Sequence, residues 1–150
     1  MNDSSPKPEE LRPDIYKQVK ARCAAGDRHC ETGEYAQALS EFEKALKLLP
    51  PPAERWEAGI WILTAIGDAH YGMGEFEKAR VALTGAMRCP GASGNPFIHL
   101  RLGESLFELG NHDRAMDELR RAHMEAGPDI FEDEDPKYLA FLKKHVKDVN

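Results

Sequence analysis

The stretch AIGDAHYGMGEFEKARVALTGAM, from Ala65 to Met87, holds three glycines within eight residues: Gly67, Gly72 and Gly74. Glycine weakens a helix, and it is common where a backbone loop wraps around a phosphate. Here the last two glycines lead into Glu75 and Glu77, whose charges would repel a phosphate, and no Gly-Lys-Ser/Thr follows. The stretch therefore favours an architectural role for the glycines over a nucleotide-binding loop.

The same spacing occurs twice more, in AGDRHCETGEYAQALSEFEKAL from Ala25 and in LGESLFELGNHDRAMDELRRAH from Leu102. Each copy has a glycine, six further residues and a second glycine, and then a ring, an alanine, a large apolar residue and another alanine at fixed steps. These positions hold Gly26, Gly33, Tyr35, Ala38, Phe42 and Ala45, then Gly67, Gly74, Phe76, Ala79, Leu83 and Ala86, then Gly103, Gly110, His112, Ala115, Leu119 and Ala122. A proline follows each copy, at Pro50, Pro90 or Pro128.

This pattern resembles the tetratricopeptide repeat, a helix–turn–helix unit of about 34 residues. The resemblance covers roughly residues 19–128. It implies an all-α fold: an α-solenoid of three such helix pairs with a C-terminal capping helix. The sequence departs from the family pattern at Arg22, Leu63 and His99, where a large aromatic is usual, and at His29, His70 and Leu106.

The glycines also have a physical explanation within such a fold. A glycine inside a helix costs about 1 kcal/mol relative to alanine, which is reasonable where another helix passes too close for a side chain. We expect Gly26, Gly67 and Gly103 to be such positions, facing Ala38, Ala79 and Ala115. We expect Gly33, Gly74 and Gly110 to end the first helix of each pair with a positive φ.

The chain is predicted to form one domain over residues 13–150, after a disordered N-terminal tail at residues 1–12. The repeats are placed at about 19–52, 60–93 and 96–128, and the capping helix at 136–147. The expected helices are Pro13–Thr32, Glu34–Leu48, Ala53–Met73, Glu75–Arg88, Pro96–Leu109, Asn111–Glu125 and Pro136–Val146. AERWEAG is expected to lengthen the third helix at its start, and GASGN at Gly91–Asn95 to form a flexible connector.

Composition narrows the classes of partner. Hydrophobic residues make up 41% and charged residues 31% of the 150 residues, with a formal net charge of −6. An acidic protein repels nucleic acid and anionic lipid, so we expect neither as a partner, and a basic protein instead. Three cysteines behind a start without a signal-peptide pattern indicate reduced thiols and a cytoplasmic location.

No residue pattern indicates an enzyme or a cofactor. Asp27 and His29, like Asp68 and His70, are two residues apart on a helix and so point to opposite sides, and no nucleophile or His-Glu-x-x-His motif is present. The two histidines are expected in or near the core. Cys23, Asp27 and Cys30 share a helix face, but zinc sites normally use four ligands, so no metal is expected. The acidic run Phe131–Pro136 lacks the pattern of a calcium loop and is expected to be solvated.

Because the first helix of each pair lines a concave groove in the family, the resemblance implies a partner-binding face opposite the packing glycines. Its candidates are Lys20, Cys23, Asp27 and Cys30, then Trp61, Thr64, Asp68 and Tyr71, then Phe97, Arg101, Glu104 and Glu108. Asp27, Asp68 and Glu104 are predicted to form one negative stripe. Some relatives grip a chaperone's C-terminal carboxylate with Lys, Asn and Arg. The matching positions hold Cys23, Asp27 and Ala65, although Arg101 fits, so this role is disfavoured.

The sequence therefore predicts a non-catalytic module that binds a basic protein through an acidic and aromatic groove. One specific hypothesis is an immunity-type inhibitor of a toxin domain, because the chain also looks like small bacterial repeat proteins with that use. The alternative is a secretion-type chaperone or a general scaffold, and an enzyme is the least favoured class. The sequence leaves the oligomeric state open.

Overall fold

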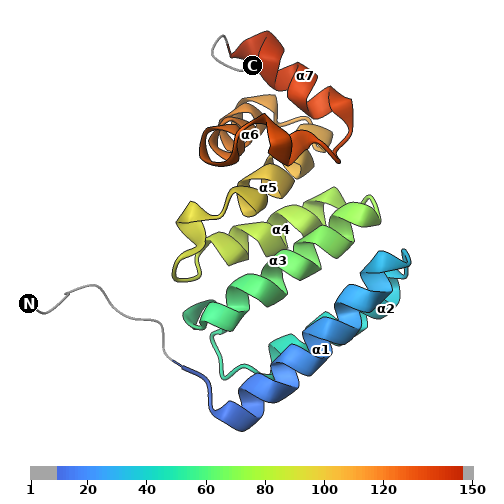
Figure 1. Ribbon diagram of the computed structural model, residues 1–150, viewed down its shortest axis with the longest axis vertical. Helices are drawn as coiled ribbons and strands as arrows, with labels where there is room; N and C mark the ends of the chain where they lie inside the picture. Colours follow the sequence, from blue (N-terminus) through green and yellow to red (C-terminus); the bar gives the residue numbers. More distant parts are fainter. Residues whose placement is uncertain (1–9, 147–150) are drawn as a thin grey trace, which may run out of the picture.

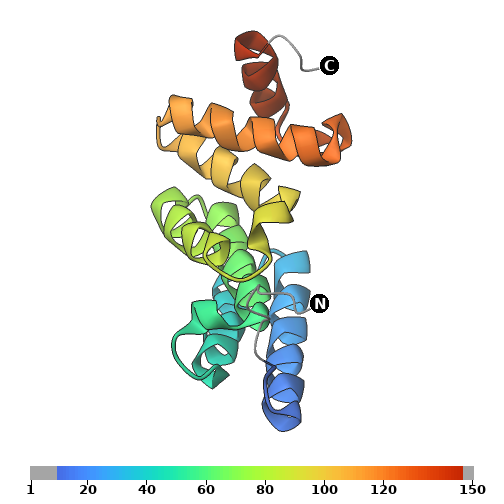
Figure 2. The ribbon, with the colours of Figure 1, turned by 90° about the vertical axis from the view of Figure 1, so that its left-hand side faces the viewer.

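The computed structural model describes residues 10–146, apart from the side chain of Ser93. Within this part, the chain forms seven α-helices and three short 3-10 turns, with no strand, and the helices stack in antiparallel pairs along one axis (Figures 1 and 2). The helices are α1 Pro13–Glu31, α2 Tyr35–Leu48, α3 Glu57–Gly72, α4 Phe76–Met87, α5 Pro96–Glu108, α6 His112–Ala126 and α7 Pro136–His145. The turns are η1 Ala53–Arg55, η2 Ala92–Gly94 and η3 Pro128–Phe131. The expected all-α solenoid with a C-terminal capping helix is confirmed.

The disordered tail expected at residues 1–12 lies mostly outside the described residues. Of its last three residues, Leu11 is half-buried and packs against the apolar core between the first two helix pairs. The described chain thus makes apolar contacts before α1 begins at Pro13.

The turn that ends the first helix of each pair contains a glycine with positive φ, as the sequence predicts. Gly33, Gly74 and Gly110 have φ values of 74°, 75° and 82°. In the first pair, the amide of Gly33 donates to Cys30 O (3.1 Å) and that of Glu34 donates to His29 O (2.8 Å). The same two bonds recur in the other pairs, so each turn is a Schellman motif that satisfies the last carbonyls of its helix.

The packing glycines face large side chains rather than the alanines that we expected. A Cβ on Gly26 would lie 2.3 Å from the Phe42 ring, and one on Gly67 would lie 2.5 Å from Leu83 Cγ. In the third pair, a Cβ on Gly103 would lie 2.8 Å from Leu119. The large apolar residue of the second helix therefore fills the space that the glycine leaves. The alanines of the motif, Ala38, Ala79 and Ala115, are themselves fully buried.

The middle one of the three clustered glycines, Gly72, has a separate role. A Cβ on Gly72 would lie 2.6 Å from the ring of Tyr35. Gly72 ends α3 and Tyr35 begins α2, so this glycine lets the first repeat pack closely against the second. Gly67, Gly72 and Gly74 thus all serve helix packing or helix termination.

Two connections differ from the sequence prediction. AERWEAG does not lengthen α3, because Ala53–Arg55 forms a 3-10 turn and Trp56 is extended, so the helix begins at Glu57. The indole of Trp56 is buried and its Nε1 donates to Pro50 O at 2.5 Å, which holds the backbone in this turn. The connector at Gly91–Asn95 contains the turn η2 and buries Ala92, so it packs against the core instead of crossing solvent freely.

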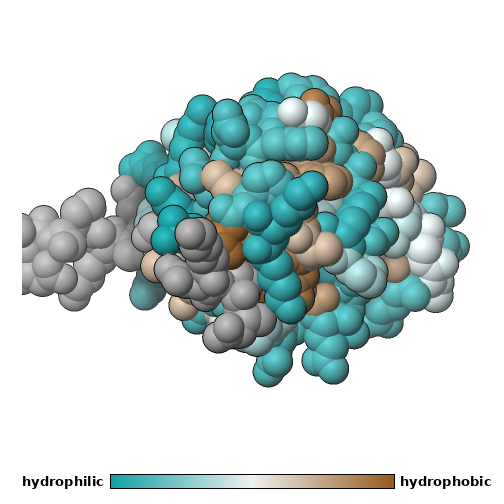
Figure 3. Space-filling view, turned by 90° about the horizontal axis from the view of Figure 1, so that it is seen from above, coloured by the Kyte–Doolittle hydropathy of each residue, from teal (hydrophilic) through white to brown (hydrophobic). Residues whose placement is uncertain are grey.

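The last helix covers the apolar end of the array. Tyr138 and Leu142 of α7 are buried against Leu119 and Ala122 of α6 and against Phe131 of η3. Helix α7 begins after Asp135, whose side chain accepts from the amide of Lys137 at 3.0 Å. The end of the molecule seen in Figure 3 is mostly hydrophilic, as expected for the capped end of a repeat array.

Candidate functional site

The twelve candidate residues all lie on α1, α3 and α5, the first helices of the three pairs. The structure does not bring them into one continuous face. Six of them line a groove, namely Asp27, Cys30, Trp61, Thr64, Asp68 and Phe97. The other six do not line it.

The groove has a volume of about 510 Å³ and is bordered by three carboxylates: Asp27, Glu31 and Asp68. Partial burial raises the pKa of Asp27 above its usual value, and repulsion from Glu31 and Asp68 raises it further. Among the described residues, no side-chain hydrogen bond or ion pair neutralises Asp27 or Glu31. Two carboxylates of the groove, Asp27 and Glu31, therefore have no internal counter-charge.

Aromatic surface lies beside these carboxylates. Trp61 is 41% exposed, and its ring meets the ring of Tyr16 edge-on at a centroid distance of 5.9 Å. Phe97 is half-buried at the α5 side of the groove. An exposed indole beside charged groups is typical of positions that contribute strongly to protein binding.

Arg101 is the centre of a second cluster, next to the groove. Its guanidinium forms ion pairs with Asp68 (2.7 Å), Glu104 (2.6 Å) and Glu134 (2.6 Å). It also lies over the rings of Tyr71 and Phe97, and its Cζ atom is 4.5 Å from the first centroid and 5.0 Å from the second. Although burial opposes its charge, the three carboxylates hold the pKa of Arg101 above its ordinary value. Arg101 is therefore already saturated with anionic partners.

Glu104 corrects the prediction of a three-acid stripe. Its side chain has no exposed surface and lies against Arg101, so it does not face the groove. Burial raises the pKa of Glu104 to about 9, with a further contribution from Glu134, against the opposing effect of Arg101. Only Asp27 and Asp68 of the predicted stripe line the groove, and Glu31 supplies the third carboxylate.

The segment after η3 and the first turn of α7 cover the end of the predicted face. Tyr138 donates to Glu108 at 2.7 Å, and its hydroxyl lies 2.6 Å from that of Tyr71. Lys137 forms an ion pair with Glu108 at 2.5 Å. Tyr71 and Glu108, predicted to contact a partner, therefore bind the chain's own C-terminal segment. The acidic run that we expected to be solvated contributes Glu134 to Arg101 and Asp135 to the cap of α7.

Lys20 and Cys23 lie apart from the groove. The Lys20 ammonium is 5.5 Å from the centroid of the Tyr16 ring. Cys23 packs against the apolar core between the first two helix pairs. Burial, and next the charge of Asp27, raises the pKa of Cys23 to about 11, which keeps the thiol protonated. Within residues 10–146, no three histidine, cysteine or acidic side chains converge on a point where a metal could bind.

The histidines at the two equivalent positions are half-buried, near the expected edge of the core. Each faces the glutamate that follows the turn glycine: His29 Nδ1 lies 3.3 Å from Glu34, and His70 Nδ1 lies 3.7 Å from Glu75. A third histidine, which the sequence analysis did not place in the core, is buried more deeply than these two. His99 is 1% exposed and its Nδ1 lies 2.6 Å from Glu118 of α6.

Two further residues at the site escaped the sequence analysis. Tyr16 lies one helical turn before Lys20 on the same face of α1, and this spacing was the available signal. Glu134 had no comparable signal, because its contact with Arg101 depends on the path that the chain takes through η3.

Comparison with known proteins supports the resemblance to the tetratricopeptide repeat. A family model described as "Tetratricopeptide repeat" matches residues 64–129. The Arabidopsis OM64 TPR domain has a TM-score of 0.70 at 18% identity, over 88% of this chain and 99% of that domain. Residues 64–129 thus match the tetratricopeptide repeat family, and the array as a whole has the fold of solved tetratricopeptide domains. No curated protein matches the sequence of this chain.

Other solved tetratricopeptide structures resemble this fold and carry bound peptides. The Yersinia enterocolitica type III secretion chaperone SycD, in complex with a peptide of the translocator YopD, has a TM-score of 0.67 at 16% identity, over 91% of this chain and 95% of SycD. The second TPR domain of human RPAP3, in complex with an HSP70 peptide, has a TM-score of 0.67 at 15% identity, over 87% and 96%. At these identities the likeness concerns the fold alone.

Tetratricopeptide repeat domains are generally non-catalytic modules for protein interaction, and their curved stacks form extended binding surfaces. In the described part of this chain, no helix combines the length and the apolar character that crossing a bilayer requires.

Proposed function

We propose that this chain is a non-catalytic binding protein that holds a basic segment of a partner protein in the groove between α1, α3 and α5. The observation that carries the proposal is the groove itself, where Asp27 and Glu31 have no counter-charge and Trp61 is exposed beside them. Unpaired carboxylates attract a cationic segment and speed its association, and a desolvated indole slows its release.

The Arg101 cluster argues against an acidic ligand. One similar domain, the second TPR of Spaghetti (RPAP3), binds the HSP90 peptide SRMEEVD, which carries acidic residues. In this chain, Arg101, which fits the family's carboxylate-binding arginine, is bound by Asp68, Glu104 and Glu134. Three carboxylates around one guanidinium leave a net negative cluster, so an acidic peptide would be repelled.

Two cellular roles fit a module of this kind. One is a cytoplasmic immunity-type protein that neutralises a basic toxin domain, which the acidic net charge of −6 supports. The other is a secretion-type chaperone, which the fold shared with SycD supports. A general scaffold would use the same groove. Identification of the protein that co-purifies with this chain separates these roles.

The groove can be tested with short fluorescein-labelled peptides in which leucine alternates with arginine, glutamine or glutamate. Fluorescence anisotropy should detect saturable binding of the arginine peptide only. The Asp27→Asn/Glu31→Gln variant should weaken that binding by about fivefold or more at low salt.

The matched control removes the same charge from the outer face of the array. Asp113 and Asp117 are exposed on α6, so Asp113→Asn/Asp117→Asn has the same net charge as the groove variant. It should bind the arginine peptide almost as well as the unmodified protein. Equal weakening in both variants would show that net charge alone attracts the peptide and would exclude the groove as the site.

A further inference from the structure

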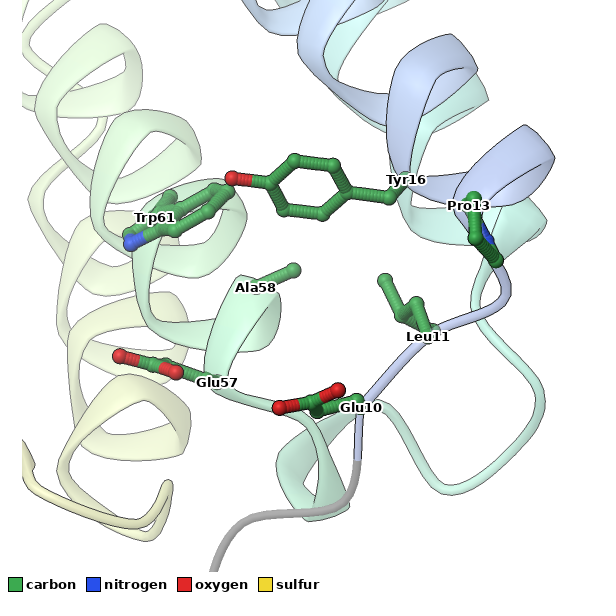
Figure 4. Close-up of a pocket in the computed structure, with 7 residues that line it drawn as sticks. All are labelled: Glu10, Leu11, Pro13, Tyr16, Glu57, Ala58 and Trp61. Carbon is green, nitrogen blue, oxygen red and sulfur yellow. The ribbon is translucent and has the colours of Figure 1, made fainter.

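A second cavity lies at the start of α1, where the chain meets the first turn of α3. Its volume is about 370 Å³, and it is lined by Glu10, Leu11, Pro13, Tyr16, Glu57, Ala58 and Trp61. Figure 4 shows the rings of Tyr16 and Trp61 on one side, the carboxylates of Glu10 and Glu57 on the other, and the Leu11 and Ala58 side chains between them. A cavity of this size is at the lower limit for small-ligand pockets, about 300 Å³, and suits one long side chain.

The aromatic side of this cavity is unusually accessible. Tyr16 is 40% exposed and Trp61 41% exposed, although most large apolar residues of the array are buried. One ring already attracts a cation of this chain, because the Lys20 ammonium lies 5.5 Å from the Tyr16 centroid. Lys20 does not line the cavity, so the indole of Trp61 stays available to a ligand.

The opposite side of the cavity carries uncompensated charge. Glu10 and Glu57 are both exposed, and no described residue forms a side-chain hydrogen bond or ion pair with either. Two carboxylates facing an indole across an apolar floor suit a group that is planar, cationic and weakly hydrated. A guanidinium has these properties, since it stacks on aromatic rings and pairs with carboxylates, whereas an ammonium is more strongly hydrated.

We propose that this cavity is a subsite that takes an arginine side chain of the partner protein. The inference rests on the proposed function, because Trp61 borders both this cavity and the acidic groove. A basic segment lying in the groove would pass Trp61 and could insert one arginine between the indole and the two glutamates. The subsite anchors one end of the segment and selects arginine over lysine.

The test uses a monomeric probe on the full chain, so that it reports on the cavity and not on the groove. N-acetylarginine amide is titrated while 1H–15N NMR spectra record the indole N–H of Trp61 and the amides of Leu11 and Ala58. Trp61→Phe assigns the signal, because the chain has two tryptophans and Trp56 is buried. We expect saturable shifts at these three groups, weaker shifts with N-acetyllysine amide and none with the uncharged citrulline analogue.

The Glu10→Gln/Glu57→Gln variant should bind the arginine probe at least about twofold more weakly. The control variant Asp113→Asn/Asp117→Asn should bind it as the unmodified protein does. Both glutamates are exposed, and unchanged shifts of the remaining amides show that the variant keeps its fold. No saturable shift of the Trp61 indole, or equal shifts with arginine and citrulline, would overturn the proposal.

The two proposals fail in different ways. If the alternating arginine peptide binds in the groove but the cavity does not respond to N-acetylarginine amide, the arginine subsite is wrong and the proposed function stands. If the cavity responds and the peptide shows no loss in Asp27→Asn/Glu31→Gln, the groove is wrong and the arginine site stands alone.

Discussion

The glycines of the second repeat occupy different environments, so they differ in what they tolerate. Gly67 lies in α3 against the side chain of Leu83, whereas Gly85 lies in α4 with Leu63 at an ordinary contact distance. Both are buried helical positions, so intrinsic helix propensity favours alanine equally at each, by about 1 kcal/mol. Space alone distinguishes them.

Gly67→Ala should therefore destabilise the protein, while Gly85→Ala should be neutral or stabilising. A Cβ at residue 67 would lie 2.5 Å from Leu83 Cγ, and overpacking of this kind costs about 1–3 kcal/mol. At residue 85 the nearest atom is 3.5 Å away, so the helix-propensity gain remains. Urea unfolding followed by circular dichroism measures both. Equal stability of the two variants would mean that α3 and α4 pack less closely than described.

At the scale of the element, α7 differs from the other helices because it has no partner helix in a repeat of its own. Its Tyr138 and Leu142 side chains are buried against α6 and η3. On its other side, Lys143 and Lys144 face solvent. The last unit of a repeat array exposes an apolar face unless a polar-faced element covers it. Loss of contacts along α7 should therefore affect solubility as well as stability.

Leu142→Ala should lower the free energy of unfolding by about 2–5 kcal/mol, because Leu142 of α7 is fully buried against α6. Lys143→Ala, on the exposed side of the same helix, should change it by less than about 0.5 kcal/mol. Thermal melts and size-exclusion chromatography give both readouts. A Leu142→Ala variant that melts normally as a monomer would show that α7 is not needed as a cap.

Local signals account for the elements that the sequence predicted well. The turn glycines, and the Asn95-Pro96 and Asp135-Pro136 pairs, act within one helical turn, so they define helix ends without knowledge of the fold. The start of α3 was missed because it depends on Trp56 reaching Pro50 across a turn. The site was predicted only in part, since helical spacing gives the face of Asp27 but not the partner that buries Glu104.

At the scale of the whole molecule, the Arg101 cluster joins three parts of the array. Asp68 belongs to the second repeat, Arg101 and Glu104 to the third, and Glu134 to the segment before α7. Ion pairs from one guanidinium thus fix the second repeat to the third and to the C-terminal segment. Because three carboxylates share this one cation, a proton on the buried Glu104 relieves their repulsion.

This arrangement predicts how global stability changes with pH. Burial, assisted by Glu134, raises the pKa of Glu104 to about 9 in the folded protein, above the value of about 4.3 in an unfolded chain. The folded state therefore keeps a proton that the unfolded state releases between these pH values. The stabilisation by this proton is fully present below about pH 4 and is lost as the pH rises towards 9. Over this range the free energy of unfolding falls by at most about 1.4 kcal/mol per pH unit.

Glu104→Gln removes this titration but keeps the size of the side chain, so the free energy of unfolding of the variant relative to the unmodified protein should rise from pH 5 to pH 8. Urea unfolding at several pH values measures this difference. Glu108→Gln is the control with the opposite sign. Although burial opposes it, the contacts with Lys137 and Tyr138 lower the pKa of Glu108, so its stabilisation is present at neutral pH and lost on acidification. A difference for Glu104→Gln that stays constant or falls with pH would show that Glu104 is ionised in the folded array and that its pairing with Arg101 outweighs its burial.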